Sequence, residues 1–529
     1  MKWKLVSLFA ALLFASVLLV QPAKATSYVN PNQVYTYERL TLDIKMLAKK
    51  YPGLVEYQSL GKSPYGREIW AVKLGKGDAT VFYNASHHAR EWLTTNIVME
   101  MLDQYSEAYS RNAKFEGYDV RKVLNGTSIW FVPMVNPDGV TLQQKGLNAF
   151  PKSVHKKLIK MNGGSKNFKR WKANGQGIDL NRQYPANWNN LSKNSSVKSP
   201  AYKNFSGTKP LQTLETQKLT KFTYFEDPEI TVSYHSSGRI LFWYFNNKAQ
   251  YLERDRKIAQ AYGSMSRYSL VKPSKSPAGG GYKDWFIQTF NRPGLTPEIS
   301  YHVGETNPPL SVFNEEWKRN RKAGLYIANE GKKLWEQKVI DANFNITTFQ
   351  RVPLYNRPNT QHKTSMYLSP AYVKVTGIYN DYFRVSTSNG PKWIKKGQYI
   401  QGTYKKINTQ LWLTEKTQLH RAPIAATAGT FINSQVVQAV KSYGDWYAIQ
   451  TPNGEKWIKP HNEIVNYQPK DISKVISLTT LNDWYEYPIE TKKKEKRITP
   501  QDVTSSKQWG QWYLIQTTEG QGWIKLIEE

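Results

Sequence analysis

The 529-residue chain contains no cysteine. Disulfide bonds are therefore excluded, although the start of the sequence predicts export, where small secreted proteins commonly rely on them. Core packing, with or without a bound metal ion, must hold the fold together. An exported chain without cysteine suits a bacterial extracellular protein better than an animal one.

Long apolar runs are missing everywhere except near the start. There, "MKWK" precedes the apolar stretch "LVSLFAALLFASVLLV" and the small-residue site "QPAKA", which ends before Thr26. This order is typical of a secretory signal peptide, which we place at residues 1–25. The alternative is an uncleaved membrane anchor, but the stretch is short for a bilayer span. We expect a secreted protein without stable membrane insertion.

Acidic residues are scarce relative to basic ones. The chain has 73 lysines and arginines against 41 aspartates and glutamates, a formal net charge of +32. Such an excess favours polyanionic partners. Outside a cell, we expect an anionic bacterial cell-wall polymer carrying phosphates or carboxylates rather than nucleic acid. The alternative is that the charge only keeps the protein soluble.

The length of the chain predicts two or more domains. Residues 28–340 mix helical stretches such as "LTTNIVMEMLDQYSEAY" with short β-rich runs such as "SIWFVPMV" and "EITVSY". This alternation predicts an α/β domain built on a mixed sheet flanked by helices.

The remainder of the chain contains three similar stretches, "YFRVSTSNGPKWIKK", "WYAIQTPNGEKWIKP" and "WYLIQTTEGQGWIKL". Their spacing predicts three repeats, at 345–398, 410–462 and 474–529. Each contains a β-hairpin signal, so we expect three small all-β barrels with Trp393, Trp457 and Trp523 in their cores. The repeats resemble the bacterial Src-homology-3-like domains of secreted wall enzymes, and that resemblance implies attachment to peptidoglycan.

One histidine of the first domain has a partner at an informative distance. In "SHHAREW", His88 and Glu91 are three residues apart, which can bring both side chains to one side of a helical turn. An imidazole and a carboxylate are good zinc ligands, and a catalytic zinc needs three protein ligands with one position open. On its own, an H-x-x-E pattern is common by chance.

Two further residues complete a plausible hydrolytic site. His235 ends the β-rich run "ITVSYH", and Glu298 stands in the apolar context "GLTPEIS", where a carboxylate is costly unless it is partnered or used. Two histidines and one ligating glutamate could hold zinc, and a separate glutamate could take a proton from the activated water.

The motifs "HAREW", "NPDG", "DLNR", "VSYHSSG", "GGGYKDW" and "TPEIS" occur in the order found in the zinc carboxypeptidase family, which the first domain resembles over nearly its whole length. The resemblance implies one zinc ion per chain, bound by His88, Glu91 and His235, with Glu298 as general base. It further implies that Arg90 polarises the scissile carbonyl and that Asp179 orients His88. Asn181 and Arg182 match the pair that binds a substrate carboxylate.

Two neighbouring features receive no catalytic role. His87 is expected to be a structural neighbour of the ligand His88. The "NPDG" motif is predicted to form a turn in which Asp138 and Gly139 serve the backbone geometry, outside the site.

Three departures from the digestive members of the family concern the substrate. Lys172 replaces an arginine that stabilises the oxyanion, and "SKSPAGGGYKDW" lacks the tyrosine that covers bound substrate. Lys283 falls where side-chain preference is set, and a lysine there favours an additional carboxylate on the substrate. Together with "DLNRQYPANW", these features resemble the bacterial γ-D-glutamyl-L-diamino acid peptidases.

Three hypotheses follow. The first is a secreted, monomeric zinc peptidase that cleaves peptidoglycan stem peptides, with a peptide or muropeptide as substrate. The second is a broad extracellular metallocarboxypeptidase, which the retained Asn181 and Arg182 would suit. The third is a wall-binding protein with an inactive peptidase domain, a reading weakened by the presence of every ligand and the base.

Overall fold

The computed structural model describes residues 28–424 and 429–526 and divides into two compact units, with the boundary in the chain between Gln337 and Lys338. The predicted signal peptide, residues 1–25, lies outside the described residues. Within the described ranges, every helix is too short or too polar to cross a bilayer.

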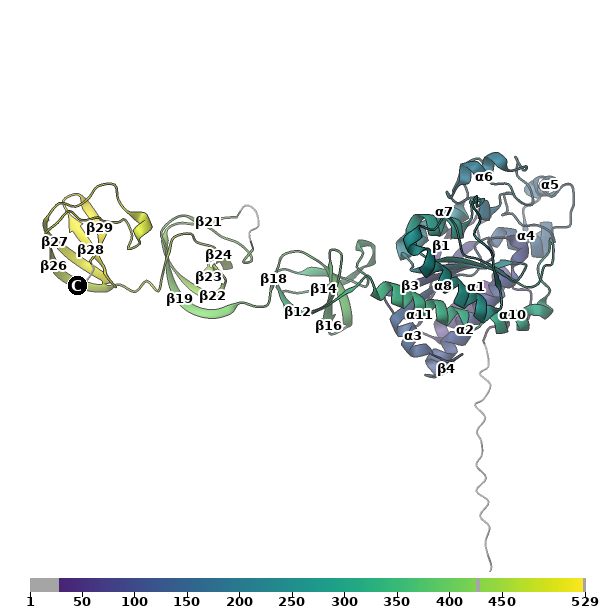
Figure 1. Cartoon of the computed structure of the whole chain (residues 1–529), viewed down its shortest axis with the longest axis horizontal. Coiled ribbons are helices and arrows are strands. Elements are labelled where there is room, and N and C mark those ends of the chain that lie inside the picture. Colours follow the sequence, from purple (N-terminus) through teal and green to yellow (C-terminus); the bar gives the residue numbers. More distant parts are fainter. Residues whose placement is uncertain (1–27, 425–428, 527–529) are drawn as a thin grey trace, which may run out of the picture. The chain divides into compact units, whose positions relative to one another are not determined.

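The first unit combines eleven strands with eleven α-helices in its described part (Figure 1). The helices are α1 (Tyr37–Lys50), α2 (Leu93–Ser110), α3 (Val120–Gly126), α4 (Pro137–Lys145), α5 (Lys152–Met161), α6 (Trp188–Asn194), α7 (Leu214–Glu226), α8 (Ala249–Ser266), α9 (Tyr282–Phe290), α10 (Phe313–Asn320) and α11 (Ala323–Glu336). The strands are β1 (Val55–Lys62), β2 (Glu68–Leu74), β3 (Ala79–Asn84), β4 (Lys114–Phe115), β5 (Tyr118–Asp119), β6 (Thr127–Val132), β7 (Ile230–Ser233), β8 (His235–Ser236), β9 (Ile240–Phe242), β10 (Ser269–Leu270) and β11 (Gly294–Ile299).

Nine of these strands form one mixed sheet in the order β1-β2-β6-β3-β7-β11-β9-β10, with β8 pairing to β11. The central strands β6, β3, β7 and β11 run parallel, while β1 and β2 join antiparallel at one edge. Parallel strands of this kind place their carboxyl ends at a common edge, where α/β proteins gather functional groups.

Successive residues of each strand point to opposite faces of the sheet, so apolar side chains lie on both faces. Helices cover both of these faces. In β3, Val81 and Tyr83 pack with α2 and α11 in one hydrophobic cluster, whereas Phe82 packs with α7 and α9 in another. Figure 1 shows α2, α3 and α11 on one side of the strands and α7 on the other.

The "NPDG" motif begins a helix, so the prediction of a turn was wrong. Asn136 caps α4 by accepting a hydrogen bond from the Gly139 backbone N–H at 2.9 Å, and Pro137 occupies the first helical position, where its missing N–H costs nothing. Asp138 is fully buried and forms an ion pair with Arg67 at 2.7 Å. The motif therefore fixes the start of α4 and is structural.

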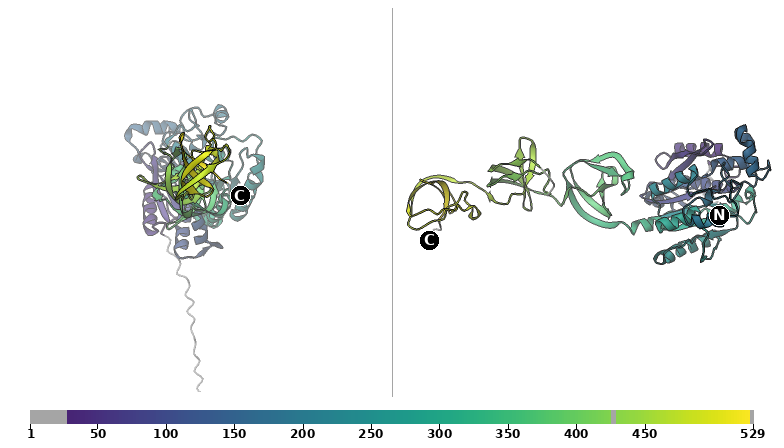
Figure 2. Two further views of the ribbon diagram at one scale, coloured as in Figure 1. Left: turned by 90° about the vertical axis from the view of Figure 1, so that its left-hand side faces the viewer. Right: turned by 90° about the horizontal axis from the view of Figure 1, so that it is seen from above.

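The second unit consists of antiparallel strands in three modules (Figure 2). The first module contains β12 (Ile340–Thr348), β13 (Val352–Tyr355), β14 (Lys363–Leu368), β15 (Tyr372–Tyr379), β16 (Tyr382–Thr387), β17 (Gly390–Lys395) and β18 (Tyr399–Gln401). The second contains β19 (Lys405–Leu413), β20 (Thr417–Gln418), β21 (Phe431–Ile432), β22 (Gln435–Tyr443), β23 (Trp446–Thr451), β24 (Gly454–Ile458) and β25 (Glu463–Val465). The third contains β26 (Lys470–Leu478), β27 (Gln501–Trp509), β28 (Trp512–Thr517) and β29 (Gly520–Lys525).

The predicted hairpin recurs in each module. The pairs β16–β17, β23–β24 and β28–β29 are antiparallel and are joined by two-residue loops, and the second strand of each pair begins with a glycine with positive φ, at Gly390, Gly454 and Gly520. Trp393, Trp457 and Trp523 are each at most 2% exposed, which confirms that they are core residues. The predicted fold class, a mixed sheet flanked by helices and followed by small antiparallel β modules, is confirmed.

Candidate active site

The carboxyl ends of three central strands supply the predicted site. His88 and Glu91 follow β3, on a loop that continues into the short 3₁₀ helix Ala89–Glu91. His235 follows β7, and Glu298 lies near the end of β11. These segments are far apart in sequence, and the parallel sheet order β3-β7-β11 brings them together.

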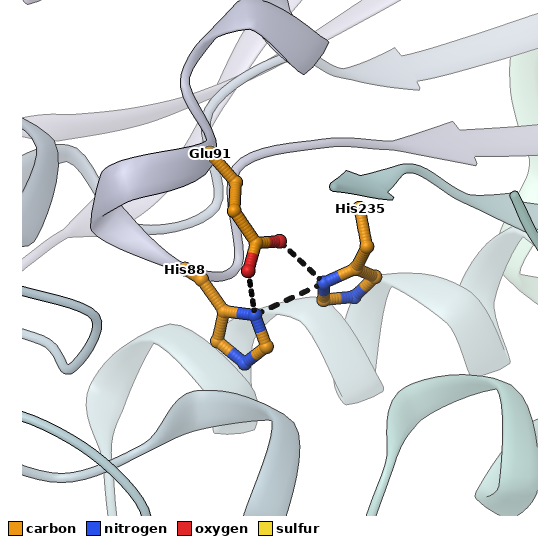
Figure 3. A group of neighbouring side chains, drawn as sticks. All are labelled: His88, Glu91 and His235. Carbon is orange, nitrogen blue, oxygen red and sulfur yellow. Dashed lines mark hydrogen bonds and ion pairs between the residues drawn. The ribbon is translucent and has the colours of Figure 1, made fainter. Parts of the chain in front are cut away.

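His88, Glu91 and His235 direct one donor atom each toward a common point (Figure 3). His88 Nδ1 lies 2.8 Å from Glu91 Oε1, His235 Nδ1 lies 2.9 Å from Glu91 Oε2, and the two Nδ1 atoms are 3.1 Å apart. All three residues are buried. Burial alone would raise the pKa of Glu91, but the two histidines hold it well below its ordinary value.

Asp179 fixes the orientation of His88. Its Oδ1 lies 3.0 Å from His88 Nε2, and because a carboxylate only accepts, this nitrogen must carry the hydrogen. The lone pair of Nδ1 is then free to bind a metal. Burial opposes the charge of Asp179, yet Lys172, His88 and Arg182 hold its pKa well below the usual range.

The donor set fits zinc. Around a tetrahedral zinc with bonds of about 2.0 Å, ligand atoms lie about 3.3 Å apart, close to the 3.1 Å between the two Nδ1 atoms and the 2.8 and 2.9 Å from each of them to one Glu91 oxygen. Two imidazoles and one carboxylate leave a fourth position open, as in catalytic zinc sites. A cation at their common point would satisfy three donor atoms that otherwise crowd one another.

Glu298 lies beside this centre because β11 pairs with β8 in parallel register, Glu298 opposite His235. Its side chain lines the same cavity as His88. Burial raises the pKa of Glu298 well above its ordinary value, the charge of Glu91 adds to this rise, and Lys172 opposes it. A carboxyl group in this environment can accept a proton near neutral pH.

A cavity of about 390 Å³ opens onto His88 and Glu298. Four of the other predicted site residues line it: Lys172, Asn181, Arg182 and Lys283. Small residues of the segment 273–281 and the aromatic residues 242–244 form much of the remaining wall. The cavity can therefore hold an extended peptide next to the metal ligands.

Asn181 and Arg182 lie on the short 3₁₀ helix Leu180–Arg182, which Asp179 caps. The amide oxygen of Asn181 accepts a hydrogen bond from the Tyr282 backbone N–H at 3.0 Å, which leaves its amide hydrogens for a ligand. Among the described residues, the Arg182 guanidinium bonds only to the Asn181 carbonyl oxygen, at 3.2 Å. Both groups therefore retain donors that can bind a carboxylate.

Lys172 and Lys283 differ in the contacts that their ammonium groups already make. Lys172 lies 3.4 Å from Asp179, which is the carboxylate that orients His88. Lys283 is 2.6 Å from Asp284 and also donates to the Tyr244 carbonyl oxygen at 2.8 Å. Since Asp284 lines the same cavity, it offsets the charge that was predicted to attract an additional substrate carboxylate.

Arg90 does not lie among the residues that line the cavity. Its guanidinium donates to the Arg170 carbonyl oxygen at 3.0 Å and pairs with Glu305 at 3.4 Å. Glu305 also pairs with Lys203. The predicted role of Arg90 at the scissile carbonyl stays a prediction, and it would require the side chain to leave these partners.

His87 is completely buried, and one of its ring nitrogens lies 2.9 Å from the Tyr184 hydroxyl. Its ring also stacks on that of His235, with centroids 5.6 Å apart. Burial holds the pKa of His87 well below its ordinary value, so this residue packs as a neutral support for a metal ligand.

Sequence reasoning missed Asp284 and Lys272, which also line the cavity, and Glu305, which holds Arg90. Asp284 lies inside the quoted motif "GGGYKDW", so its position next to Lys283 was a usable signal. Nothing in the local sequence around Glu305 indicates its partner.

The glycines of that motif allow one wall of the cavity to form. Gly279 has φ of +80°, and a Cβ there would lie 2.2 Å from the Ala186 carbonyl oxygen. The neighbouring Gly280 backbone N–H donates to that same oxygen at 2.7 Å. Any larger residue at 279 would push this wall away from the Asn181–Arg182 turn.

Residues 41–323 match the family model described as zinc carboxypeptidase. The gamma-D-glutamyl-L-diamino acid endopeptidase 1 of Lysinibacillus sphaericus is 35% identical over 303 residues, covering 56% of this chain and 74% of that protein. The uncharacterised protein YqgT of Bacillus subtilis (strain 168) is 31% identical over 292 residues, covering 54% and 75%. The solved structure of thrombin activatable fibrinolysis inhibitor aligns with a TM-score of 0.46 at 18% identity, covering 58% of this chain and 76% of that one.

The family match includes both zinc-binding segments and the strand that carries Glu298. Peptide hydrolysis, which was predicted from the ligand set and the base, agrees with this assignment. The chain belongs to the zinc carboxypeptidase family and is a zinc metallopeptidase whose metal site is formed by His88, Glu91 and His235.

Proposed function

We propose that the protein is a secreted endopeptidase that hydrolyses peptidoglycan stem peptides at the bond between γ-D-glutamate and a diamino acid. The observation that carries this proposal is the basic cavity beside the metal ligands, where Lys172, Arg182, Lys272 and Lys283 meet only two lining carboxylates, Asp284 and Glu298. Stem peptides are anionic, and cations that line a cavity concentrate anionic substrates. The relationship to the Lysinibacillus enzyme supports the same bond.

Each group of the site has a separate role in the proposed hydrolysis. Zinc, when bound, lowers the pKa of a water molecule and polarises the scissile carbonyl. The Glu298 carboxylate would accept a proton from the attacking water and later donate it to the leaving amine of the diamino acid. Lys172 contributes positive charge near the oxygen on which negative charge develops, as a single point charge rather than an arginine fork.

Asn181 and Arg182 bind a carboxylate of the substrate. In an endopeptidase acting on a stem peptide, this carboxylate belongs to the diamino acid side. A chain-terminal carboxylate would bind in the same way, so this pair also favours a second candidate function, a broad metallocarboxypeptidase that removes C-terminal residues. The two functions differ in the bond that is cleaved.

The second unit is proposed to hold the enzyme on the cell wall. Its three modules repeat one hairpin and resemble Src-homology-3-like domains, and the net positive charge of the chain suits an anionic wall polymer. Each module has its own small hydrophobic cluster, so its core does not depend on the first unit.

One experiment separates the two cleavage specificities. The zinc-loaded protein without residues 1–25 is incubated with purified sacculi, defined muropeptides and ordinary peptides, and the products are identified by mass spectrometry. Release at the γ-D-glutamyl bond is expected. Trimming of ordinary peptides without any γ-D-glutamyl cleavage would refute the endopeptidase and support the carboxypeptidase.

Wall attachment is tested by ending the chain at Gln337, the last residue of the first unit. The shortened protein should lose most of its co-sedimentation with sacculi while it still cleaves small soluble muropeptides. Equal sedimentation of both forms would show that the second unit does not retain the enzyme.

A further inference from the structure

The segment between Asp138 and Asp179 contains no aspartate or glutamate and nine lysines or arginines. Six of the lysines are exposed: Lys152, Lys156, Lys157, Lys160, Lys166 and Lys169. We call these six residues the α5 patch. None of them pairs with a carboxylate in the part of the chain that the structure describes, in contrast to Lys145, which pairs with Glu38 at 2.8 Å.

Helix geometry gathers the first four lysines on one side of α5. At 100° per residue, Lys152, Lys156, Lys157 and Lys160 span an arc of about 140°. The buried residues Leu158 and Met161 fall outside that arc and face the interior. Figure 1 shows α5 at the outer edge of the first unit. Because the four lysines are exposed, the charged side of the helix can meet a large partner.

The buried side of α5 connects the patch to the active site. Leu158 and Met161 pack in one hydrophobic cluster with Trp171 and with Ala89, which stands between His88 and Arg90. Lys172, next to Trp171, lines the catalytic cavity. A polymer bound to the α5 patch is therefore held by the same packed element that supports the zinc ligands.

We propose that the α5 patch binds a linear phosphodiester polymer of the cell wall and holds the first unit against its substrate. This inference rests on the proposed function, since it assumes that the substrate lies in a wall carrying such a polymer. Six exposed cations that form no ion pair with a described carboxylate complement a polymer with regularly spaced negative charges, and binding releases the counterions of that polymer. The first unit thus has a wall contact of its own, in addition to any contact of the second unit.

The test uses two triple variants of the full protein. Lys156→Gln, Lys157→Gln and Lys160→Gln remove charge from the α5 patch, and Lys49→Gln, Lys221→Gln and Lys318→Gln remove the same charge from exposed, dispersed positions on α1, α7 and α10. Glutamine keeps helix propensity close to that of lysine. Hydrolysis of a small soluble muropeptide, together with thermal unfolding, checks that each variant is folded; failure of the wild type to cleave it refutes the proposed function rather than this inference.

Binding is measured by fluorescence anisotropy with labelled poly(glycerol phosphate) at several salt concentrations. The α5 variant should bind about tenfold more weakly than the wild type. The slope of the logarithm of its binding constant against the logarithm of salt concentration should fall in magnitude by about one for each lysine that contacts a phosphate. The dispersed variant should stay within about twofold of the wild type. Equal losses in both variants would overturn the proposal. Tighter binding of a DNA duplex with the same number of phosphates, lost in the α5 variant, would assign the patch to nucleic acid and also overturn it.

Discussion

His235 and Glu298 are register partners in the parallel pairing of β8 with β11. Side chains of register partners emerge on the same side of a sheet, from strands about 4.8 Å apart. The separation between a zinc ligand and the proposed base is therefore set by backbone pairing rather than by a flexible loop. Such a site is preorganised, which is the condition under which a positioned carboxylate is effective in catalysis.

Replacement of the base should abolish turnover without loss of the metal. Glu298→Gln keeps the size of the side chain but cannot accept a proton, so we expect the rate constant kcat to fall about a hundredfold to ten-thousandfold. Zinc content, measured by mass spectrometry of the metal, should stay at one ion per chain because Glu298 is not a ligand. A fully active variant would rule out Glu298 as the general base.

Asp179 should control zinc affinity through His88. In Asp179→Asn, the amide no longer fixes the hydrogen on His88 Nε2, and we expect zinc to bind about 10- to 100-fold more weakly. Competition with a chelator measures this affinity. Asp284→Asn serves as a control because Asp284 lines the same cavity without contacting a ligand. Equal zinc affinities in the two variants would contradict the orienting role of Asp179.

The pair Lys283–Asp284 should limit the affinity for anionic substrates. In Asp284→Asn, the ammonium group of Lys283 loses its ion-pair partner at 2.6 Å and becomes available to a substrate carboxylate. We expect KM for a muropeptide with a free carboxylate on its diamino acid to fall about threefold to tenfold, the effect of one partly exposed ion pair. The corresponding amidated muropeptide should show little change. An equal fall for both substrates would place the effect elsewhere in the cavity.

Glu215 should make the stability of the first unit dependent on pH. It lies in the first turn of α7, is fully buried and accepts one hydrogen bond from Asn174 at 3.2 Å. Burial, with a smaller contribution from Asp138, raises its pKa to about 7. Because the folded protein holds this proton more tightly than the unfolded chain, stability is complete below about pH 4.5 and declines as the pH rises through 7, by up to about 3 kcal/mol.

In Glu215→Gln this decline should disappear. We therefore expect the melting temperature of the first unit to fall less between pH 5.5 and pH 8.5 in the variant than in the wild type, by several degrees. Glu253→Gln is the matched control, since Glu253 is an exposed residue of α8 that pairs with Arg256. Other groups that titrate in this range are common to all three proteins. Parallel curves for wild type and Glu215→Gln would show that Glu215 does not titrate there.

The parts of the site that the sequence predicted rest on local patterns and on the order of motifs. His88 and Glu91 are three residues apart, and His235 ends a β-rich run, so local patterns indicated them as candidates; their grouping with Glu298 came from the order of motifs shared with the zinc carboxypeptidase family. Local patterns also predicted the repeated hairpins, whose turn residues directly connect the paired strands.

The parts that it missed depend on contacts between distant segments. Arg90 meets Glu305 across more than 200 residues, and no local pattern encodes that ion pair. The turn predicted for "NPDG" failed for a related reason. Asn136 caps a helix whose start is reinforced by the buried pair of Asp138 with Arg67, a residue 71 positions earlier. Asp284 is an exception, because it is the sequence neighbour of Lys283 and was overlooked although it lies inside the quoted motif.

The distribution of the zinc ligands along the chain also governs when the enzyme can first act. His88 and Glu91 are synthesised early, but His235 comes 144 residues after Glu91, and Glu298 comes later still. A nascent or truncated chain that ends before β11 lacks the base and cannot complete the central sheet. Proteolytic activity therefore begins only after most of the first unit has been made and folded.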